Sequence, residues 1–156
     1  MQFSYTFFCA SLSMLAMASF GVSTPIAAPR GTAAPNPPAY LVSHEQMLHW
    51  LSNTDAKLNF VGAPPNPLAS RDGPTTTVTF CSSRIDSICG GTCNVYTGGP
   101  TCVDAPGTSC LAATNDVAFC DRGGCGGSCN LLSTCGSPLD NGFCSTPGTA
   151  SIVVQA

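Results

Sequence analysis

Charged side chains are scarce in this chain of 156 residues, since only 8% of them are Asp, Glu, Lys or Arg. Five Lys and Arg stand against eight Asp and Glu, which gives a formal net charge of −3. Proteins that hold nucleic acid or anionic lipid by electrostatics carry a basic patch, and so few basic residues do not make one. The composition therefore excludes nucleic acid and an anionic membrane surface as expected partners.

The first segment has no charged side chain at all. Residues 1–22 contain an apolar run, 7–18, that is rich in Ser and Ala and shorter than the ~20 residues of a membrane-spanning helix. The pattern predicts a secretory signal peptide over 1–18, with Ala27 or Ala28 as a later cleavage point and a retained anchor helix as the alternative. We therefore expect a secreted, extracellular protein with no membrane attachment after cleavage, followed by a Pro- and Ala-rich linker over 19–40.

Residues 41–74 predict a short N-terminal amphipathic helix between proline clusters. Ser43 and Gln46 have the spacing of a capping box, so we expect a helix over 44–52. Its apolar residues, Met47, Leu48, Trp50 and Leu51, bunch on one side, which means that the helix docks on another part of the chain. His44 and His49 would lie about 140° apart, so we expect both to be solvated rather than to bind a metal. The flanking prolines make this segment a candidate arm or pro-segment.

Cysteine is concentrated in residues 81–144, which hold ten of the eleven and contain no His, Lys, Glu, Gln, Met or Trp. In an oxidising compartment an even set of thiols forms disulfides, so we expect five bridges and no metal or cofactor. The alternative, a metal held by the two Cys-x-x-x-Cys pairs, would lack any histidine ligand in the domain. The ten are Cys81, Cys89, Cys93, Cys102, Cys110, Cys120, Cys125, Cys129, Cys135 and Cys144.

The cysteine-rich region repeats itself. Two five-cysteine units, 80–110 and 119–144, share a Cys-Gly-Gly-[Thr/Ser]-Cys-Asn core, which indicates a degenerate internal duplication, with chance similarity as the alternative. Pro-Gly-Thr also occurs twice, at 106–108 and 147–149, out of register with the cysteines. Because each unit has an odd number of cysteines, an odd number of bridges must cross between the units. Which cysteines pair is not readable from the sequence.

The domain over 75–156 is expected to be small, disulfide-rich and β-rich or irregular. Residues 75–80 alternate with period two and predict a strand, and 152–154 form a second β-branched run that would tie the domain ends together if the two pair. Turns are expected at 97–100, 122–124 and 140–142. The expected core is sparse and includes Ile85, Ile88 and Leu131, so cross-links must supply stability.

Catalytic residue patterns are nearly absent. The cysteine-rich domain has neither His nor Glu, and the chain has no G-x-S-x-G elbow, so a Ser-His-Asp hydrolase is not expected. Paired carboxylates could still cleave a glycoside, although Asp beside turn residues is more often a turn former. The candidates are Asp86, Asp104, Asp116, Asp121 and Asp140.

A binding surface is the other function that these residues indicate. Tyr96 lies next to the expected 97–100 turn, and amide side chains beside an exposed aromatic ring suit a sugar. The candidate binding residues are Tyr96, Asn94, Asn130 and Arg122. A place for Tyr96 in the core is the alternative.

The chain resembles small secreted cysteine-rich proteins of filamentous fungi, especially mushroom-forming ones. The motifs that carry the resemblance are Cys-Gly-Gly-x-Cys-Asn-Val-Tyr-x-Gly-Gly, Ala105 to Thr108, Phe119 to Cys125 and Leu139 to Cys144, preceded by Trp50 to Thr54. The resemblance implies an extracellular effector or a cell-surface factor and supplies no catalytic residues. We therefore expect a monomeric interaction protein that binds an extracellular protein or a cell-wall glycan. A carbohydrate-binding module and, behind it, an Asp-dependent glycoside hydrolase are the alternatives.

Overall fold

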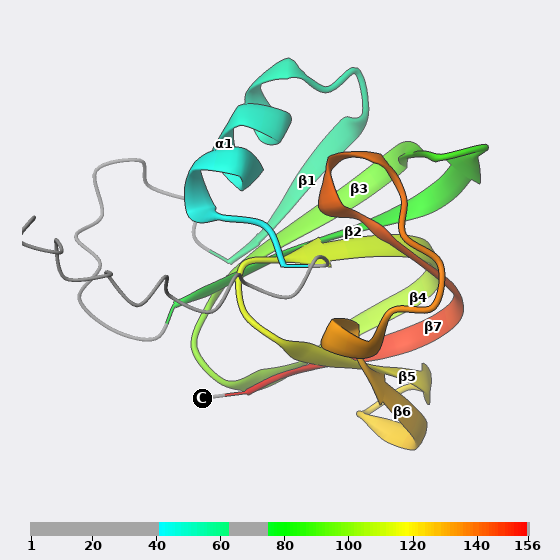
Figure 1. Cartoon of the computed structure of the whole chain (residues 1–156). Coiled ribbons are helices and arrows are strands. Elements are labelled where there is room, and N and C mark those ends of the chain that lie inside the picture. Colours follow the sequence, from blue (N-terminus) through cyan, green and yellow to red (C-terminus); the bar gives the residue numbers. More distant parts are fainter. Residues whose placement is uncertain (1–40, 63–74, 156) are drawn as a thin grey trace, which may run out of the picture. The chain divides into compact units, whose positions relative to one another are not determined.

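The computed structural model describes residues 41–62 and 75–155 (Figure 1). The expected signal peptide and linker, and residues 63–74 of the expected arm, lie outside the described residues. The described ranges contain one α-helix, seven β-strands and two short 3-10 helices. In chain order they are α1 (His44–Asn53), β1 (Lys57–Gly62), β2 (Thr76–Ile85), β3 (Ile88–Gly98), β4 (Thr101–Ala113), β5 (Val117–Arg122), β6 (Gly126–Leu131), η1 (Leu132–Thr134), η2 (Asp140–Gly142) and β7 (Cys144–Val154).

All seven strands belong to one sheet, in the order β1-β3-β2-β4-β7-β5-β6. β1 runs parallel to β3, and every other neighbouring pair is antiparallel. The 152–154 run lies in β7 and pairs with β4 and β5, so it does not pair with the 75–80 strand. The reason is that the long strand β4 lies between β2 and β7 and hydrogen-bonds to both.

Two hairpins repeat the same local structure on either side of the β4–β7 pair. Cys81 lies opposite Cys93 in the β2–β3 hairpin, and Cys120 lies opposite Cys129 in the β5–β6 hairpin. Each hairpin has a β-bulge directly after its first cysteine. The second Gly of each Cys-Gly-Gly motif lies across from that bulge with a positive φ. The repeated motif therefore encodes a bulged, disulfide-bonded hairpin.

The Pro-Gly-Thr tripeptides occupy equivalent places in the sheet although they are out of register with the cysteines. Thr108 in β4 lies directly opposite Thr149 in β7. Each threonine hydroxyl donates 2.8 Å to the carbonyl three residues earlier, at Ala105 and Thr146. The register of β4 with β2 and of β7 with β5 matches too, which places Ser151 where the first half has Cys110. Strand pairing thus shows that the two units correspond at positions that the cysteine spacing does not align.

The disulfides join Cys81 to Cys93, Cys89 to Cys110, Cys102 to Cys125, Cys120 to Cys129 and Cys135 to Cys144. One bridge, Cys102–Cys125, crosses between the two five-cysteine units, which confirms the parity argument. The expectation of a small, β-rich, disulfide-rich domain is confirmed as well. Disulfide frameworks of this density are typical of extracellular proteins. None of the helices in the described ranges has the length and apolar character to cross a bilayer.

Two hydrophobic clusters cover the two faces of the sheet. Alternate residues of β2 divide between them, with Val78 and Phe80 in one cluster and Cys81 in the other. Residues 76–81 are therefore buried throughout, as in a strand that is covered on both sides. Ile85, Ile88 and Leu131 were expected in the core and are exposed instead. Ile85 and Ile88 flank the two-residue β2–β3 turn, which extends beyond both clusters.

The helix α1 lies over the cluster that contains three of the disulfide cysteines of β2 and β3 (Figure 1). Its capping box is formed: Gln46 N donates to Ser43 Oγ, and Ser43 N donates to Gln46 Oε1. Met47 is 2% exposed, and its sulfur accepts a hydrogen bond from the hydroxyl of Thr79 at 3.2 Å. The described part of the expected arm thus packs on the disulfide domain, and β1 extends the sheet. Excision of this arm stays a prediction.

Candidate binding site

Two of the four expected binding residues, Asn94 and Tyr96, lie on β3. Tyr96 is half-buried against the Val78–Phe80 cluster, and its hydroxyl donates to the carbonyl of Gly99 at 2.8 Å. This bond braces the turn between β3 and β4. Asn94 Oδ1 accepts from Asn59 Nδ2 of β1 at 3.3 Å. Both side chains therefore have structural partners. The half-buried position of Tyr96 favours the alternative that it belongs to the core.

The other two residues belong to the opposite hairpin. Arg122 ends β5 and Asn130 lies in β6, and both are exposed. β2, β4, β7 and β5 separate β3 from β6 in the sheet. The strand order therefore does not bring the four residues together into one surface.

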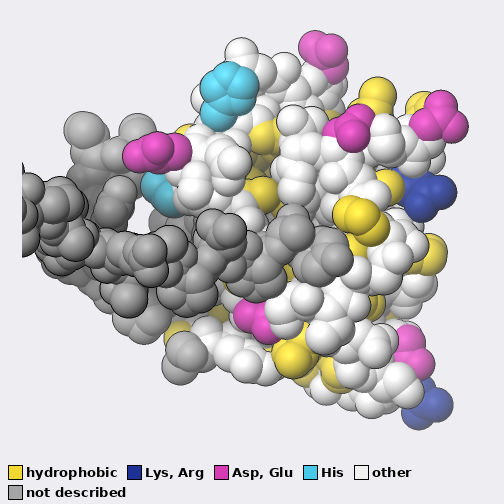
Figure 2. All heavy atoms as spheres, viewed as in Figure 1, with side chains coloured by type: hydrophobic (Ala, Val, Ile, Leu, Met, Phe, Trp, Pro, Cys, Tyr) yellow, Lys and Arg dark blue, Asp and Glu magenta, His cyan; other side chains and the backbone are white. Residues whose placement is uncertain are grey.

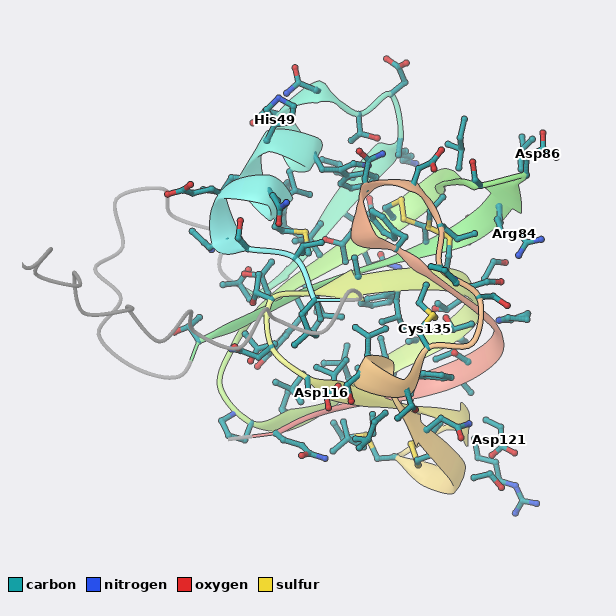
Figure 3. All side chains as sticks on the ribbon, viewed as in Figure 1. His49, Arg84, Asp86, Asp116, Asp121 and Cys135 are labelled. Carbon is teal, nitrogen blue, oxygen red and sulfur yellow. A yellow bond between two sulfur atoms is a disulfide. The ribbon has the colours of Figure 1, made fainter. Side chains whose placement is uncertain are left out.

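The candidate carboxylates are spread over the sheet, with Asp104 in β4, Asp121 in β5 and the other three in connections between strands. Asp116 accepts from the backbone N–H of Ser133 at 2.9 Å and from its hydroxyl at 2.6 Å, which ties the β4–β5 connection to η1. Asp121 accepts from the N–H of Ser128 across the β5–β6 bulge, and Asp140 accepts from the hydroxyl of Ser87. Figure 3 shows Asp86, Asp116 and Asp121 on different parts of the sheet. Three of the five carboxylates thus accept hydrogen bonds that hold separate segments together, a structural role that competes with a catalytic one.

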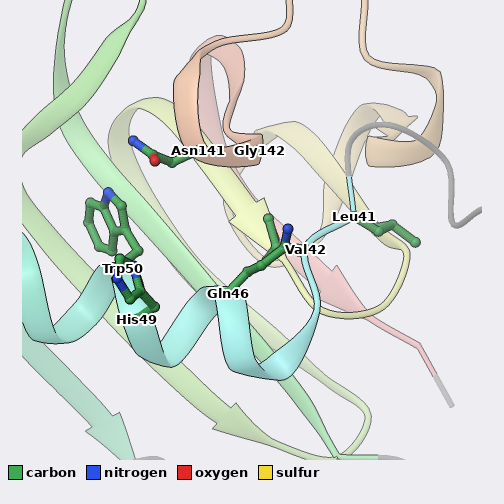
Figure 4. A pocket seen from close by; sticks show the side chains of 7 residues that line it. All are labelled: Leu41, Val42, Gln46, His49, Trp50, Asn141 and Gly142. Carbon is green, nitrogen blue, oxygen red and sulfur yellow. The ribbon is translucent and has the colours of Figure 1, made fainter.

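A groove lies between η2, α1 and the segment that leads into α1 (Figure 4). The groove has a volume of about 300 Å³, at the lower end of the range for small-molecule sites. Its aromatic wall is Trp50, whose ring packs on Phe143 with centroids 4.8 Å apart and planes tilted by 54°. The lining residues are Leu41, Val42, Gln46, His49, Trp50, Asn141 and Gly142.

The η2 side of the groove is held in place by backbone contacts. Asp140 N donates to the carbonyl of Ser87 at 2.9 Å, and Leu139 N donates to the carbonyl of Phe143 at 2.7 Å. Asn141 has φ 58° and ψ 26°, a left-handed conformation that Asn tolerates better than most residues. Gly142 also has a positive φ, and a Cβ there would collide with Val42. The Asn-Gly pair therefore sets the close approach between this turn and the segment that leads into α1.

Sequence reasoning did not identify this groove. The pattern of α1 indicated only an apolar face that docks, and Asn141-Gly142 indicated only a turn. The feature of the sequence that could have indicated the groove is Trp50, because it is the one Trp of the chain and lies beside polar residues on the helix. Its pairing with a turn some ninety residues later depends on long-range packing.

Among residues 41–62 and 75–155, no group of three or more His, Cys, Asp or Glu side chains could hold a metal ion. No protein-family model matches this chain, and no match was found among the curated proteins or the solved structures compared with it. The case for a function therefore depends on the chain's own residues and geometry.

Proposed function

We propose that this chain is a secreted cysteine-rich interaction protein, effector-like or associated with a cell wall, that acts by binding. The observation that carries the proposal is the covalent framework, in which five disulfides link strands or adjoining turns of one sheet. Such frameworks belong to small proteins that fold in an oxidising compartment. They also hold surface side chains in place before a partner arrives, which lowers the entropy cost of binding.

The character of the surface supports an uncharged mode of recognition. In the face shown in Figure 2, the charged side chains of the described residues are few and scattered. An extracellular protein or a neutral cell-wall glycan suits such a surface better than a polyanion does. The hydrogen bonds that Asp116, Asp121 and Asp140 accept from other segments favour a structural role for them, and so favour binding over glycoside cleavage.

The test uses the oxidised protein, isolated with its bridges intact. We expect it to be retained on insoluble β-glucan or chitin, or to capture a defined extracellular protein, without releasing soluble sugar. Protein that has been reduced and alkylated is the control, and we expect it to lose retention because the framework is gone. Release of sugar that increases with time, and that an Asp→Asn change among the five candidate carboxylates abolishes, would replace this proposal with the hydrolase alternative. Failure to bind wall material or any extracellular protein would also overturn it.

A further inference from the structure

The groove between α1 and η2 has a preformed aromatic wall. Trp50 is half-buried, and its ring is supported by Phe143, which is itself 2% exposed. Phe143 follows η2 directly and donates from its N–H to the carbonyl of Asp140. Phe143 thus orients the indole of Trp50 and closes the turn that carries Asn141. The two sides of the groove are therefore placed relative to each other before a ligand binds.

The polar groups around this wall are neutral hydrogen-bonding groups. Asn141 and His49 are exposed, so their amide and imidazole groups are open to a ligand. Gln46 uses Oε1 in the capping box, which leaves its amide N–H groups as donors toward the groove. No Asp, Glu, Lys or Arg is among the described residues that line it. A charged ligand would therefore lose hydration there without gaining a counter-charge.

An aromatic wall next to neutral hydrogen-bonding groups limits the class of ligand that the groove can bind. A sugar ring has one face of C–H groups that can stack on an aromatic ring and a rim of hydroxyls that pair with amides and imidazole. A purely apolar ligand would leave Gln46 and Asn141 facing apolar groups without partners. We infer that the groove binds a neutral hexose unit of a glycan, stacked on Trp50 and hydrogen-bonded by Asn141 and His49. This inference depends on the proposed function and names the ligand class and the site for it.

The chain supplies its own probe, because Trp50 is its only tryptophan. Titration of the oxidised full chain with a β-gluco-hexaose and with a chitohexaose is expected to give a saturable change in tryptophan emission for at least one of them. We also expect the bound sugar to shield the indole from an added quencher. A peptide mixture and a sugar acid oligomer are the comparison ligands, and neither should saturate.

Single substitutions test whether the oligosaccharide binds in the groove or elsewhere on the surface. Trp50→Ala and Asn141→Gly should each weaken oligosaccharide binding by about tenfold or more in calorimetric titration. Gly suits the left-handed backbone at 141, so this change removes the amide without straining the turn. Gln155→Ala removes an exposed amide that follows β7 and does not line the groove, so it should leave the affinity unchanged. Circular dichroism of each variant checks that the fold is retained.

The two proposals fail in different ways. If a hexaose binds while Trp50 emission stays constant and Asn141→Gly binds like the unmodified chain, the groove is not the site and the proposed function stands. If no sugar binds but a defined extracellular protein is captured, the glycan inference is overturned and the interaction role is retained. If neither a glycan nor a protein binds, both are overturned.

Discussion

At the scale of single residues, the two glycines of each Cys-Gly-Gly motif have different roles. Gly91 has φ +82°, and a Cβ there would collide with the side chains of Ser82 and Ser83 at the bulge. The hydroxyl of Ser82 accepts from the N–H of Thr92 at 3.1 Å, so the space above Gly91 is already used. Gly90 has an ordinary φ and open space around its Cα. The first glycine of the motif is therefore replaceable, and the second is not.

Gly91→Ala should lower the free energy of unfolding by about 1–2 kcal/mol, because an L-residue in the left-handed region is strained and the bulge must shift. The matched variant Gly90→Ala should stay within about 0.5 kcal/mol of the unmodified chain. Urea denaturation under non-reducing conditions measures both. Equal losses for the two variants would contradict the bulge explanation of the motif.

At the scale of elements, α1 is held by noncovalent contacts alone, since no cysteine lies between residues 41 and 62. Met47 is its one fully buried side chain, and it contacts the cluster that contains Cys81, Cys93 and Cys110. Helices of this length are marginal in isolation, so the docked face and the capping box must supply most of the helix stability. The helix in turn covers disulfides on that face of the sheet.

Met47→Ala should cost about 2–5 kcal/mol, the usual loss for a large buried side chain. His44→Ala, on the exposed side of the first turn, is the control and should change stability by less than about 0.5 kcal/mol. Thermal unfolding followed by Trp50 fluorescence reports on the helix directly. An unchanged transition for Met47→Ala would mean that α1 behaves as a separable arm, as expected for a pro-segment.

At the scale of the whole described domain, two three-stranded halves, β3-β2-β4 and β7-β5-β6, meet at the β4–β7 pair, and β1 adds a seventh strand beside β3. Four disulfides stay within one half or the other, and Cys102–Cys125 alone joins them covalently. At the position where the first half has the Cys89–Cys110 bridge, the second has Cys125 N donating to Ser151 Oγ at 3.0 Å. This exchange frees Cys125 to cross to the other half.

A Cys102→Ser, Cys125→Ser double variant should keep its fold, because the β4–β7 hydrogen bonds remain. It should lose about 3 kcal/mol of unfolding free energy, the entropic worth of a loop of this size. Denaturant titration measures the loss, and non-reducing peptide mapping of the unmodified chain checks the pairing. A map in which Cys102 joins a cysteine of its own unit would contradict the crossed bridge.

The sequence by itself determined the features that depend on neighbouring residues or on counting. The capping box at Ser43, the turns around 97–100 and 122–124, and the need for a bridge between the units all follow from residue types a few positions apart or from parity. Ancestral duplication stays a prediction, although the hairpins correspond.

Only the tertiary structure decided which strands are neighbours and which side chains meet. Placing β4 between β2 and β7 prevented the two β-branched runs from pairing, and the same order separates Tyr96 from Asn130. It left Ile85 and Ile88 exposed at a turn and brought Asn141 to Trp50. The physical reason is that such contacts gain free energy only when segments distant in sequence bury surface together, and local patterns carry no information on which segments those are.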